Sequence, residues 1–334
     1  MRVSIIGLGA AATRGHLPAL RKLEREARVQ VVAACDPDGR QRMAARRAMR
    51  ELPTFESAEE MLGSVDSDLT VIAAPPHVHA SLATLAAEHR QHIVCEKPAG
   101  CTPADVEEMV AVWRQHQDRV LFASYQYRFS RPWLAIARIA RAAARSGWRI
   151  DMSVDVQRDS TDRHAISNWR ADPAMGGGLA DHAVHFLALA REMGRPFAID
   201  LASREFDPAG REKVNACLLA GSNLFDLSVS YQAAVRSTTL TLSIGDKTIR
   251  WKDGRLAIER KDRPTHWFSV PSLSDRAHVD ALYLPMYRDF LAGSGSLRWR
   301  RDRAEELTEV GRCLAMLLAE TEQRVSVEPP ALAA

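Results

Sequence analysis

The sequence predicts an α/β protein with two parts: a doubly wound parallel sheet within residues 1–122, then a second α/β part, residues 123–334, with an open and mostly antiparallel sheet. Through the first part, short apolar runs alternate with helical patterns, which is typical of β-α-β units. From Ile199 to Glu259, apolar and polar residues alternate in short runs instead. Gly245-Asp246 and Asp253-Gly254 separate these runs and are hairpin turn pairs, so neighbouring strands should be antiparallel.

Composition limits the class of protein. A chain of 334 residues can form two domains, and a net charge of +3 is too small to indicate a nucleic-acid partner. The five cysteines include no Cys-x-x-Cys pair, so neither a disulfide framework nor a structural zinc site is expected. The first residues show no signal peptide or membrane span. These features favour a cytoplasmic protein that binds neither nucleic acid nor membrane.

The elements of the first part follow from their apolar periodicity and their end signals. Ser57 with Glu60, and Thr102 with Asp105, are typical of helix N-termini. Strands are expected at residues 3–6, 29–35, 69–73, 92–95 and 120–124. Helices are expected between them, at residues 10–27, 38–50, 57–62, 78–89 and 102–116, although Pro18 lies inside the first of these.

In the second part, the helical patterns surround the strand meander. A helix is expected at residues 133–145 and a strand at 149–156. A polar loop reaches Ala174, three glycines follow, and a helix is expected at residues 179–192. A final helix should span residues 303–322, after which Val325–Val327 could return to the sheet edge.

The first strand runs into the stretch Gly7-Leu8-Gly9-Ala10-Ala11-Ala12, which has the pattern G-x-G-x-x-A. Gly7 permits a tight turn, Gly9 lets the backbone approach a pyrophosphate, and the small Ala12 allows the helix to pack on the strand. The N–H groups at the start of the helix then face the phosphates. The motif therefore predicts a dinucleotide site, in which Leu8, Ala10 and Ala11 contribute backbone groups.

The end of the second strand suggests which dinucleotide binds. Asp36 stands where an acidic residue can accept hydrogen bonds from the adenine ribose, and its carboxylate would repel a 2′-phosphate. This favours NAD. Arg40 and Arg42 follow closely and could offset the repulsion, so NADP stays open. The alternative interpretation of Asp36 is a helix cap before Pro37.

Lys97 follows an apolar strand in the stretch Cys95-Glu96-Lys97-Pro98. Carboxyl ends of strands are where ligands bind in open α/β sheets. The chain has six lysines against thirty-nine arginines, and Lys97 is the only lysine between Lys22 and Lys213. Because a lysine can lose its proton near neutral pH and an arginine cannot, this position suits proton transfer. The alternative is a surface lysine that happens to follow a strand.

A further pair of candidate residues lies in the second part. Asp181 and His185 are four positions apart on an expected helix and therefore share one face. A histidine with a pKa near ~6.5 can move a proton at cytoplasmic pH, and Asp181 could orient it or bind a substrate hydroxyl. Asp181, His182 and His185 could instead hold a metal, but adjacent helical residues diverge too far for all three to meet one ion.

Together these motifs resemble the glucose–fructose oxidoreductase, inositol dehydrogenase and MocA-type (Gfo/Idh/MocA) family across nearly the whole chain. The segments that carry the resemblance occur in the family's order: Ala74–His79, Glu96-Lys97-Pro98, Tyr127-Arg128-Phe129, Asn168-Trp169-Arg170, Gly176-Gly177-Gly178 and Asp181–His185. Two positions depart from the family's pattern. Ala12 replaces a glycine, and Ala183 replaces a frequent glycine between the aspartate and the histidine, which leaves substrate choice less certain than the chemistry.

The resemblance implies an NAD(P)-dependent oxidoreductase that moves a hydride between nicotinamide and a secondary alcohol or ketone of a sugar, cyclitol or sugar derivative. It implies His185 as general base, Lys97 on the developing alkoxide and Asp181 holding both, although Lys97 and His185 could exchange roles. It also implies a cis Lys97–Pro98 bond and a homodimer or homotetramer. It places Ala74, Pro75, His79, Glu96 and Lys97 at the cofactor, and Arg128, His164, Trp169, Arg170 and His182 at the substrate.

Two other functions remain compatible with these residues. The same arrangement could reduce a C=N or C=C bond, with Lys97 or His185 as the proton donor. The protein could also be a non-catalytic NAD-binding sensor, although that function would not require Lys97, Asp181 and His185 to lie together.

Overall fold

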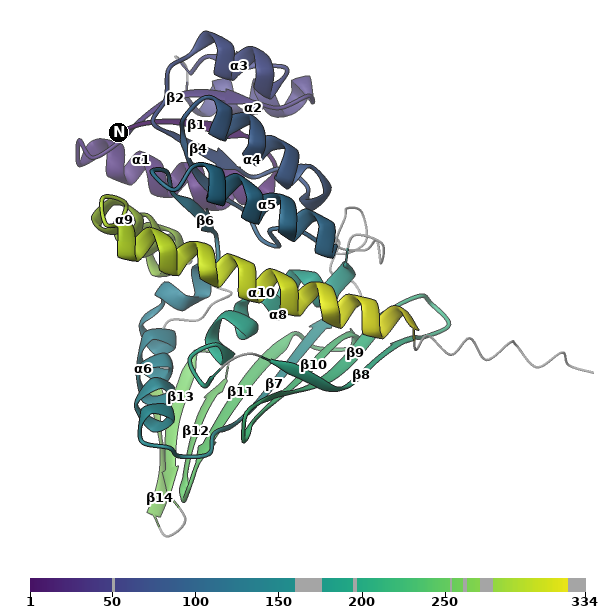
Figure 1. The fold of residues 1–334 in the computed structure, drawn as a ribbon. Helices are drawn as coiled ribbons and strands as arrows, with labels where there is room; N and C mark the ends of the chain where they lie inside the picture. The colour runs from purple at the N-terminus through teal and green to yellow at the C-terminus, as the bar shows by residue number, and fades with distance from the viewer. Residues whose placement is uncertain are drawn as a thin grey trace, which may run out of the picture.

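The computed structural model describes residues 1–49, 52–159, 176–194, 197–252, 254–260, 263–270 and 279–323. Figure 1 shows a parallel sheet flanked by helices at one end of the molecule and a broad open sheet at the other. The long helix α10 (Leu297–Gln323) runs across the molecule between them. None of the described helices is long and apolar enough to cross a membrane.

The first sheet has six parallel strands in the order β3-β2-β1-β4-β5-β6. The strand order reverses between β1 and β4, and ligands of open α/β sheets bind at the carboxyl ends beside such a reversal. The short strand β3 was not predicted, whereas the other five lie within two residues of the expected limits. The strands are β1 (Arg2–Ile6), β2 (Gln30–Cys35), β3 (Thr54–Phe55), β4 (Leu69–Ile72), β5 (His92–Cys95) and β6 (Leu121–Ala123).

Two helices of this part begin at the predicted side-chain caps. Thr102 and Asp105 form a reciprocal capping box, and Ser57 accepts a hydrogen bond from the Glu60 N–H at 3.1 Å. Each cap satisfies N–H groups that have no partner inside the helix. The elements are α2 (Gly39–Ala48), α3 (Ala58–Ser64), the 3₁₀ turn η2 (Pro76–Val78), α4 (His79–Glu88) and α5 (Pro103–Gln115).

The helix expected over residues 10–27 is present, but its first part is irregular. After the glycine loop the chain makes a π-helical turn, η1 (Ala12–His16), and the regular helix α1 spans Leu17–Arg25. Pro18 stands directly after this π turn, whose extra residue accommodates a proline that has no N–H to donate to the preceding turn.

The second sheet has eight strands in the order β14-β13-β12-β11-β7-β10-β9-β8, and its strands are antiparallel except for the β7–β10 pair. The mostly antiparallel prediction is confirmed, and the parallel pair arises because β7 inserts between β10 and β11. Its strands are β7 (Asp151–Asp159), β8 (Ala198–Phe206), β9 (Glu212–Ala220), β10 (Asn223–Ala233), β11 (Ser237–Ile244), β12 (Lys247–Lys252), β13 (Arg255–Arg260) and β14 (Arg263–Ser269).

The helices of the second part link the two sheets. The 3₁₀ turn η3 (Gln126–Phe129) leads into α6 (Arg131–Arg145). The helix α8 (Gly177–Ala190) is buried along its whole length and packs against β10, β7 and α10. Because its surroundings exclude water on every side, polar groups on α8 must find partners within the protein.

The C-terminal region contains helices that the sequence analysis missed. A π turn, η6 (Val279–Tyr283), and the helix α9 (Leu284–Gly293) precede α10 and pack on η1 and α1. The final helix begins at Leu297, six residues before its predicted start. The chain therefore returns to the first sheet after building the second. The predicted strand Val325–Val327 lies outside the described residues.

Candidate active site

The glycine loop at the end of β1 has room for a dinucleotide. Gly7 has a φ of +88°, and a Cβ there would come within 2.6 Å of the Ala73 carbonyl oxygen, so only glycine fits this turn. A Cβ at Gly9 would meet nothing within 4 Å, which leaves open space beside the loop. These residues therefore fit a pyrophosphate that approaches the backbone at Gly9 and the start of the helix at Ala10 and Ala11.

Asp36 joins this loop to the end of β2. Its Oδ2 accepts a hydrogen bond from the Leu8 N–H at 2.7 Å, and its Oδ1 accepts one from the Asp38 N–H at 2.8 Å. The cap of α2 is Asp38, whose Oδ1 accepts from the Arg40 N–H at 2.8 Å. Asp36 therefore lies beside the loop and is not the cap of α2. The Arg42 guanidinium donates to the Asp36 carbonyl at 2.7 Å, whereas the Arg40 side chain is exposed.

Lys97 meets Asp181 across eighty-four residues of sequence. The Lys97 Nζ forms an ion pair with Asp181 Oδ1 and donates a hydrogen bond to the Asp181 carbonyl oxygen at 2.8 Å. The two side chains are only 9% and 11% exposed. The Lys97–Pro98 bond is cis, as predicted. The structure therefore joins the end of β5 to the buried helix α8 through these two residues.

His185 lies one helical turn further along α8 and is 2% exposed. Its ring stacks on Tyr127, with centroids 3.9 Å apart and planes 14° apart, and its Nδ1 has no hydrogen-bond partner among the described residues. Burial lowers the pKa of His185 well below 6.5, and the positive charge of Lys97 lowers it further. The imidazole is therefore neutral near pH 7 and can accept a proton.

His182 lies beside Asp181 on α8 and makes a further set of contacts with the second sheet. Its Nε2 lies 3.1 Å from Arg158 Nε, 3.2 Å from the Tyr231 hydroxyl and 3.5 Å from Asp181 Oδ2. Burial and the charge of Arg158 lower the pKa of His182 well below its usual value. Sequence analysis missed Arg158 and Tyr231. Arg158 had a usable signal, because an arginine at an inward position of an alternating strand needs a buried partner.

The three glycines before Asp181 let α8 begin against the second sheet. Gly177 has a φ of +57°, and the Gly178 N–H donates to Glu212 Oε2 at 2.7 Å. A Cβ at Gly178 would clash with the Tyr231 ring. Glu212 also pairs with the buried Arg204 at 2.8 Å, so a carboxylate satisfies both the helix N-terminus and an arginine below it.

The predicted cofactor residue Glu96 turns its carboxylate into the protein. His16 Nε2 lies 2.9 Å from Glu96 Oε1, the Tyr283 hydroxyl donates to the same oxygen at 3.4 Å, and the Lys97 N–H donates to Oε2 at 3.2 Å. Burial alone would raise the pKa of Glu96, but His16 and Lys97 lower it overall. Its visible role is to hold the backbone at Lys97. His16 and Tyr283 were not singled out from sequence.

His79 connects the loops that follow β4 and β5. Its Nε2 lies 2.8 Å from the Ala74 carbonyl oxygen and its Nδ1 lies 2.9 Å from the Pro98 carbonyl oxygen. The ring is fully buried, and burial lowers its pKa. The side chain therefore positions Ala74, Pro75 and the Lys97–Pro98 loop at the carboxyl edge of the sheet and does not extend outward.

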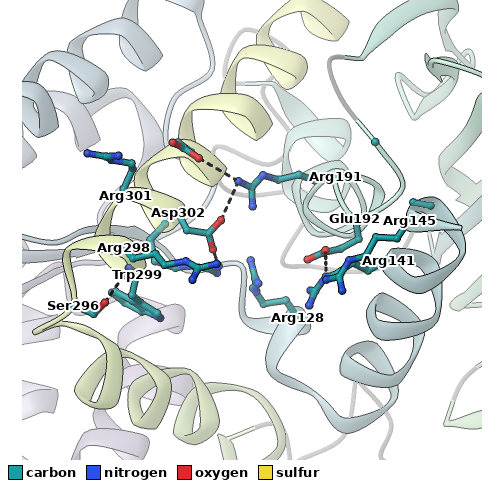
Figure 2. Close-up of a pocket in the computed structure, with 14 residues that line it drawn as sticks. Arg128, Arg141, Arg145, Arg191, Glu192, Ser296, Arg298, Trp299, Arg301 and Asp302 are labelled. Carbon is teal, nitrogen blue, oxygen red and sulfur yellow. Dashed lines mark hydrogen bonds and ion pairs between the residues drawn. The ribbon is translucent and has the colours of Figure 1, made fainter. Parts of the chain in front are cut away.

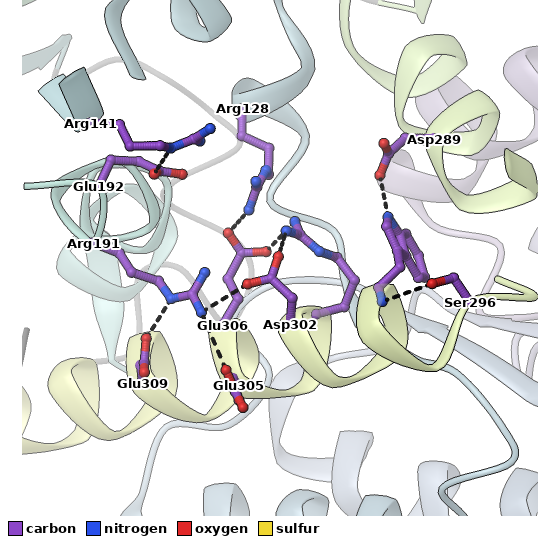
Figure 3. Close-up of polar contacts among 12 residues, drawn as sticks. Arg128, Arg141, Arg191, Glu192, Asp289, Ser296, Asp302, Glu305, Glu306 and Glu309 are labelled. Atoms are coloured by element: carbon purple, nitrogen blue, oxygen red, sulfur yellow. Dashed lines mark hydrogen bonds and ion pairs between the residues drawn. The ribbon is translucent and has the colours of Figure 1, made fainter. Parts of the chain in front are cut away.

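Arg128 is not part of the cluster formed by Lys97, Asp181 and His185. Although its neighbour Tyr127 stacks on His185, the Arg128 guanidinium pairs with Glu306 of α10 and lines a separate cavity (Figures 2 and 3). Arg128 therefore lies apart from Tyr127, because adjacent residues of η3 point in different directions, and its predicted contact with the substrate stays a prediction. The predicted substrate residues His164, Trp169 and Arg170 lie outside the described residues.

The strand order and the glycine loop define a dinucleotide-binding protein. Residues 1–124 match the model of the Gfo/Idh/MocA family, described as an oxidoreductase family with an NAD-binding Rossmann fold. Residues 1–124 are therefore similar to the NAD-binding domain of this oxidoreductase family, and the predicted resemblance is confirmed over that part of the chain.

Two relatives extend the comparison. The chain is 31% identical to inositol 2-dehydrogenase 1 from Saccharopolyspora erythraea over 144 aligned residues. The aligned region covers 43% of this chain and 42% of the relative. It is 24% identical to D-glucoside 3-dehydrogenase from Escherichia coli over 230 aligned residues. Here the aligned region covers 64% of this chain and 60% of the relative. The chain thus matches less than two thirds of the length of either relative.

Solved structures show the same fold over nearly the whole chain. A 3-ketoreductase from Actinomadura kijaniata, crystallised with NADP and TDP-benzene, superimposes with a TM-score of 0.77 and covers 97% of both chains. The sequence identity is 19%, so this likeness concerns the fold.

Proposed function

We propose that this protein is an NAD(P)-dependent dehydrogenase or reductase acting on a secondary alcohol or ketone of a sugar, cyclitol or sugar derivative. The observation that carries the proposal is the buried cluster of Lys97, Asp181 and His185 at the carboxyl edge of a dinucleotide-binding sheet. A sensor that only bound NAD would have no need to bury an amine beside a neutral imidazole.

In the proposed mechanism each of the three side chains has a separate role in proton transfer, charge stabilisation or positioning. When bound, the nicotinamide supplies the hydride chemistry. His185, neutral because it is buried beside Lys97, takes the hydroxyl proton during oxidation and returns it during reduction. Lys97 donates a hydrogen bond to the alkoxide oxygen that develops, and Asp181 keeps the ammonium in place.

The cofactor contacts are assigned to the loop of residues 7–11, Asp36, and the segments around Ala74 and Lys97. Asp36 has one carboxylate oxygen on the Leu8 N–H, which places its charge beside the loop and favours NAD over NADP by repulsion of a 2′-phosphate. Arg42 is bound to backbone carbonyls and Glu56, which leaves Arg40 as the cation that could receive a 2′-phosphate. NADP therefore remains the alternative.

We assign residues 1–122 to cofactor binding and residues 123–334 to substrate binding and oligomerisation. One face of the second sheet is covered by α8 and α10, whereas Leu201, Ile258 and Phe268 are exposed. Apolar side chains on a sheet face suit a homodimer or homotetramer. The five cysteines are all free thiols, which suits the cytoplasm.

The test is to follow NADH absorbance with the purified protein and a panel of sugars, inositols, keto-sugars and, as a contrast, cyclic imines. We expect turnover with at least one polyol or keto-sugar in the presence of NAD or NADH. Tight NADH binding with no turnover on any substrate would favour a sensor, and turnover restricted to imines would favour a C=N reductase.

A further inference from the structure

A polar cavity lies beside η3, where Arg128 forms part of its lining. It is bounded by α6, the end of α8 and the start of α10, and its volume is about 970 Å³. Figure 2 shows arginines of α6 and α8 on one side of the cavity and arginines of α10 on the other. Its seven arginines are Arg128, Arg141, Arg145, Arg191, Arg298, Arg301 and Arg303. No step of the proposed reaction uses any of them.

Four of the seven arginines have carboxylate partners (Figure 3). Five carboxylates pair with them: three belong to the cavity wall, and two more lie behind it on α10. The wall and these partners together carry two positive charges in excess. The pairs are Arg128–Glu306, Arg141–Glu192, Arg191 with Asp302, Glu305 and Glu309, and Arg303 with Asp302 and Glu306. Arg145, Arg298 and Arg301 have no ion-pair partner among the described residues.

The inner wall of the cavity carries positive charge that the carboxylates do not fully satisfy. Arg303 is 6% exposed, and its Nε is buried with no hydrogen-bond partner among the described residues. Burial and the neighbouring charge of Arg303 lower the pKa of Arg128 to about 9. An anion in the cavity would offset both costs, because each guanidinium is a donor that cannot accept.

The excess charge and the donor geometry indicate the chemistry of the ligand. A phosphate group carries close to two negative charges near neutral pH and three strong acceptor oxygens. Guanidinium groups match such oxygens through paired N–H donors, and here they approach from separate elements. A single carboxylate would balance only one of the two excess charges.

We propose that this cavity is a phosphate-binding site, separate from the nucleotide loop and from the Lys97 cluster. The bound group is inorganic phosphate or the phosphate of a monoester, held chiefly by Arg298 and Arg301 at the rim and by Arg128 and Arg303 within. The site does not rest on the proposed reaction, because its residues contact neither the glycine loop nor Lys97.

The experiment is isothermal titration of the full-length protein at constant ionic strength and a pH of about 8, where phosphate is a dianion. Inorganic phosphate and glycerol 3-phosphate are titrated separately into the wild type, into Arg298→Ala/Arg301→Ala and into the control Arg25→Ala/Arg114→Ala. The control removes two exposed arginines of α1 and α5, so net charge changes equally. We expect the cavity variant to bind at least ~10-fold more weakly than the wild type, and the control to bind like it.

The two ligands identify the source of the phosphate. Tighter binding of inorganic phosphate supports a site for the free anion, and tighter binding of glycerol 3-phosphate supports a monoester site. Equal affinities in the wild type and the cavity variant would overturn the proposal, as would the absence of binding to the wild type up to about 20 mM of either ligand. Because binding is measured directly, neither result depends on whether the protein transfers a hydride.

Discussion

Two polar clusters lie beside the helix α8 and the turn η3. One is buried throughout, and the other has a buried inner wall and an exposed rim. Tyr127 and Arg128 are adjacent in sequence, but Tyr127 stacks on His185 and Arg128 points into the arginine-lined cavity. In the first cluster, Lys97 and Asp181 are about nine-tenths buried. In the second, Arg141 is 46% exposed and still forms an ion pair with Glu192.

The comparison shows that burial, more than the number of charges, decides how much each charged group contributes. In a dry site, each interaction is strong and an orphaned charge is costly. At a solvated surface, the same ion pair is screened, and its loss changes stability little. We therefore expect substitutions in the buried cluster to have large effects, and the loss of an ion pair at the exposed rim of the arginine-lined cavity to change stability little.

The largest difference should appear in turnover. Lys97→Ala and His185→Ala should each reduce turnover by at least ~100-fold, because each removes a group that handles charge or a proton in the transition state. NADH affinity, measured by fluorescence titration, should change little. Arg298→Ala provides the matched control and should keep wild-type turnover. Near-normal rates in either cluster variant would remove that residue from the mechanism.

The next largest effect is expected at the buried ion pair between Arg204 and Glu212, below α8. Glu212→Gln should lower the free energy of unfolding by about 3 kcal/mol, because it leaves Arg204 buried without its anion. Urea denaturation measures this loss. Replacing both partners, as Arg204→Met with Glu212→Leu, should recover part of it. A loss below about 1 kcal/mol for Glu212→Gln would mean that water reaches Arg204.

The pH dependence of alcohol oxidation should reveal the buried histidine. The base must be neutral to accept a proton, and burial together with Lys97 lowers the pKa of His185 below 6.5. The neutral form therefore persists to more acidic pH than in free imidazole, and the rate should fall only below pH 6.5. The profile of kcat/KM against pH measures this limb. An acidic limb at or above pH 6.5 would contradict the environment described for His185.

The smallest effect on stability is expected at the exposed rim of the arginine-lined cavity. Arg141→Ala removes the ion pair with Glu192, but the arginine is half exposed, so the free energy of unfolding should fall by less than about 1 kcal/mol. The same urea experiment, repeated at high salt, should show little further change. A loss comparable to that of Glu212→Gln would show that water is excluded from the cavity wall as it is from Arg204.

Local patterns predicted most of the elements. The glycine loop, the caps at Ser57 and Thr102, and the alternation in the meander each concern neighbours within a few residues. The helix α9 was missed because its residues pack on α1, a segment more than 250 residues away. The π turn before Pro18 was likewise invisible, since its backbone path depends on packing against Tyr283 at Gly15.

The sequence alone determined the nucleotide loop, the candidates Lys97, Asp181 and His185, and the order of the two sheets. These features depend on local backbone requirements and side-chain chemistry. Only the tertiary structure decided that Glu96 turns inward to His16 and that Arg128 faces a different cavity from Tyr127. It also decided that burial and Lys97 lower the pKa of His185. Side-chain direction and pKa depend on burial and on partners brought from distant parts of the sequence, which no local pattern contains.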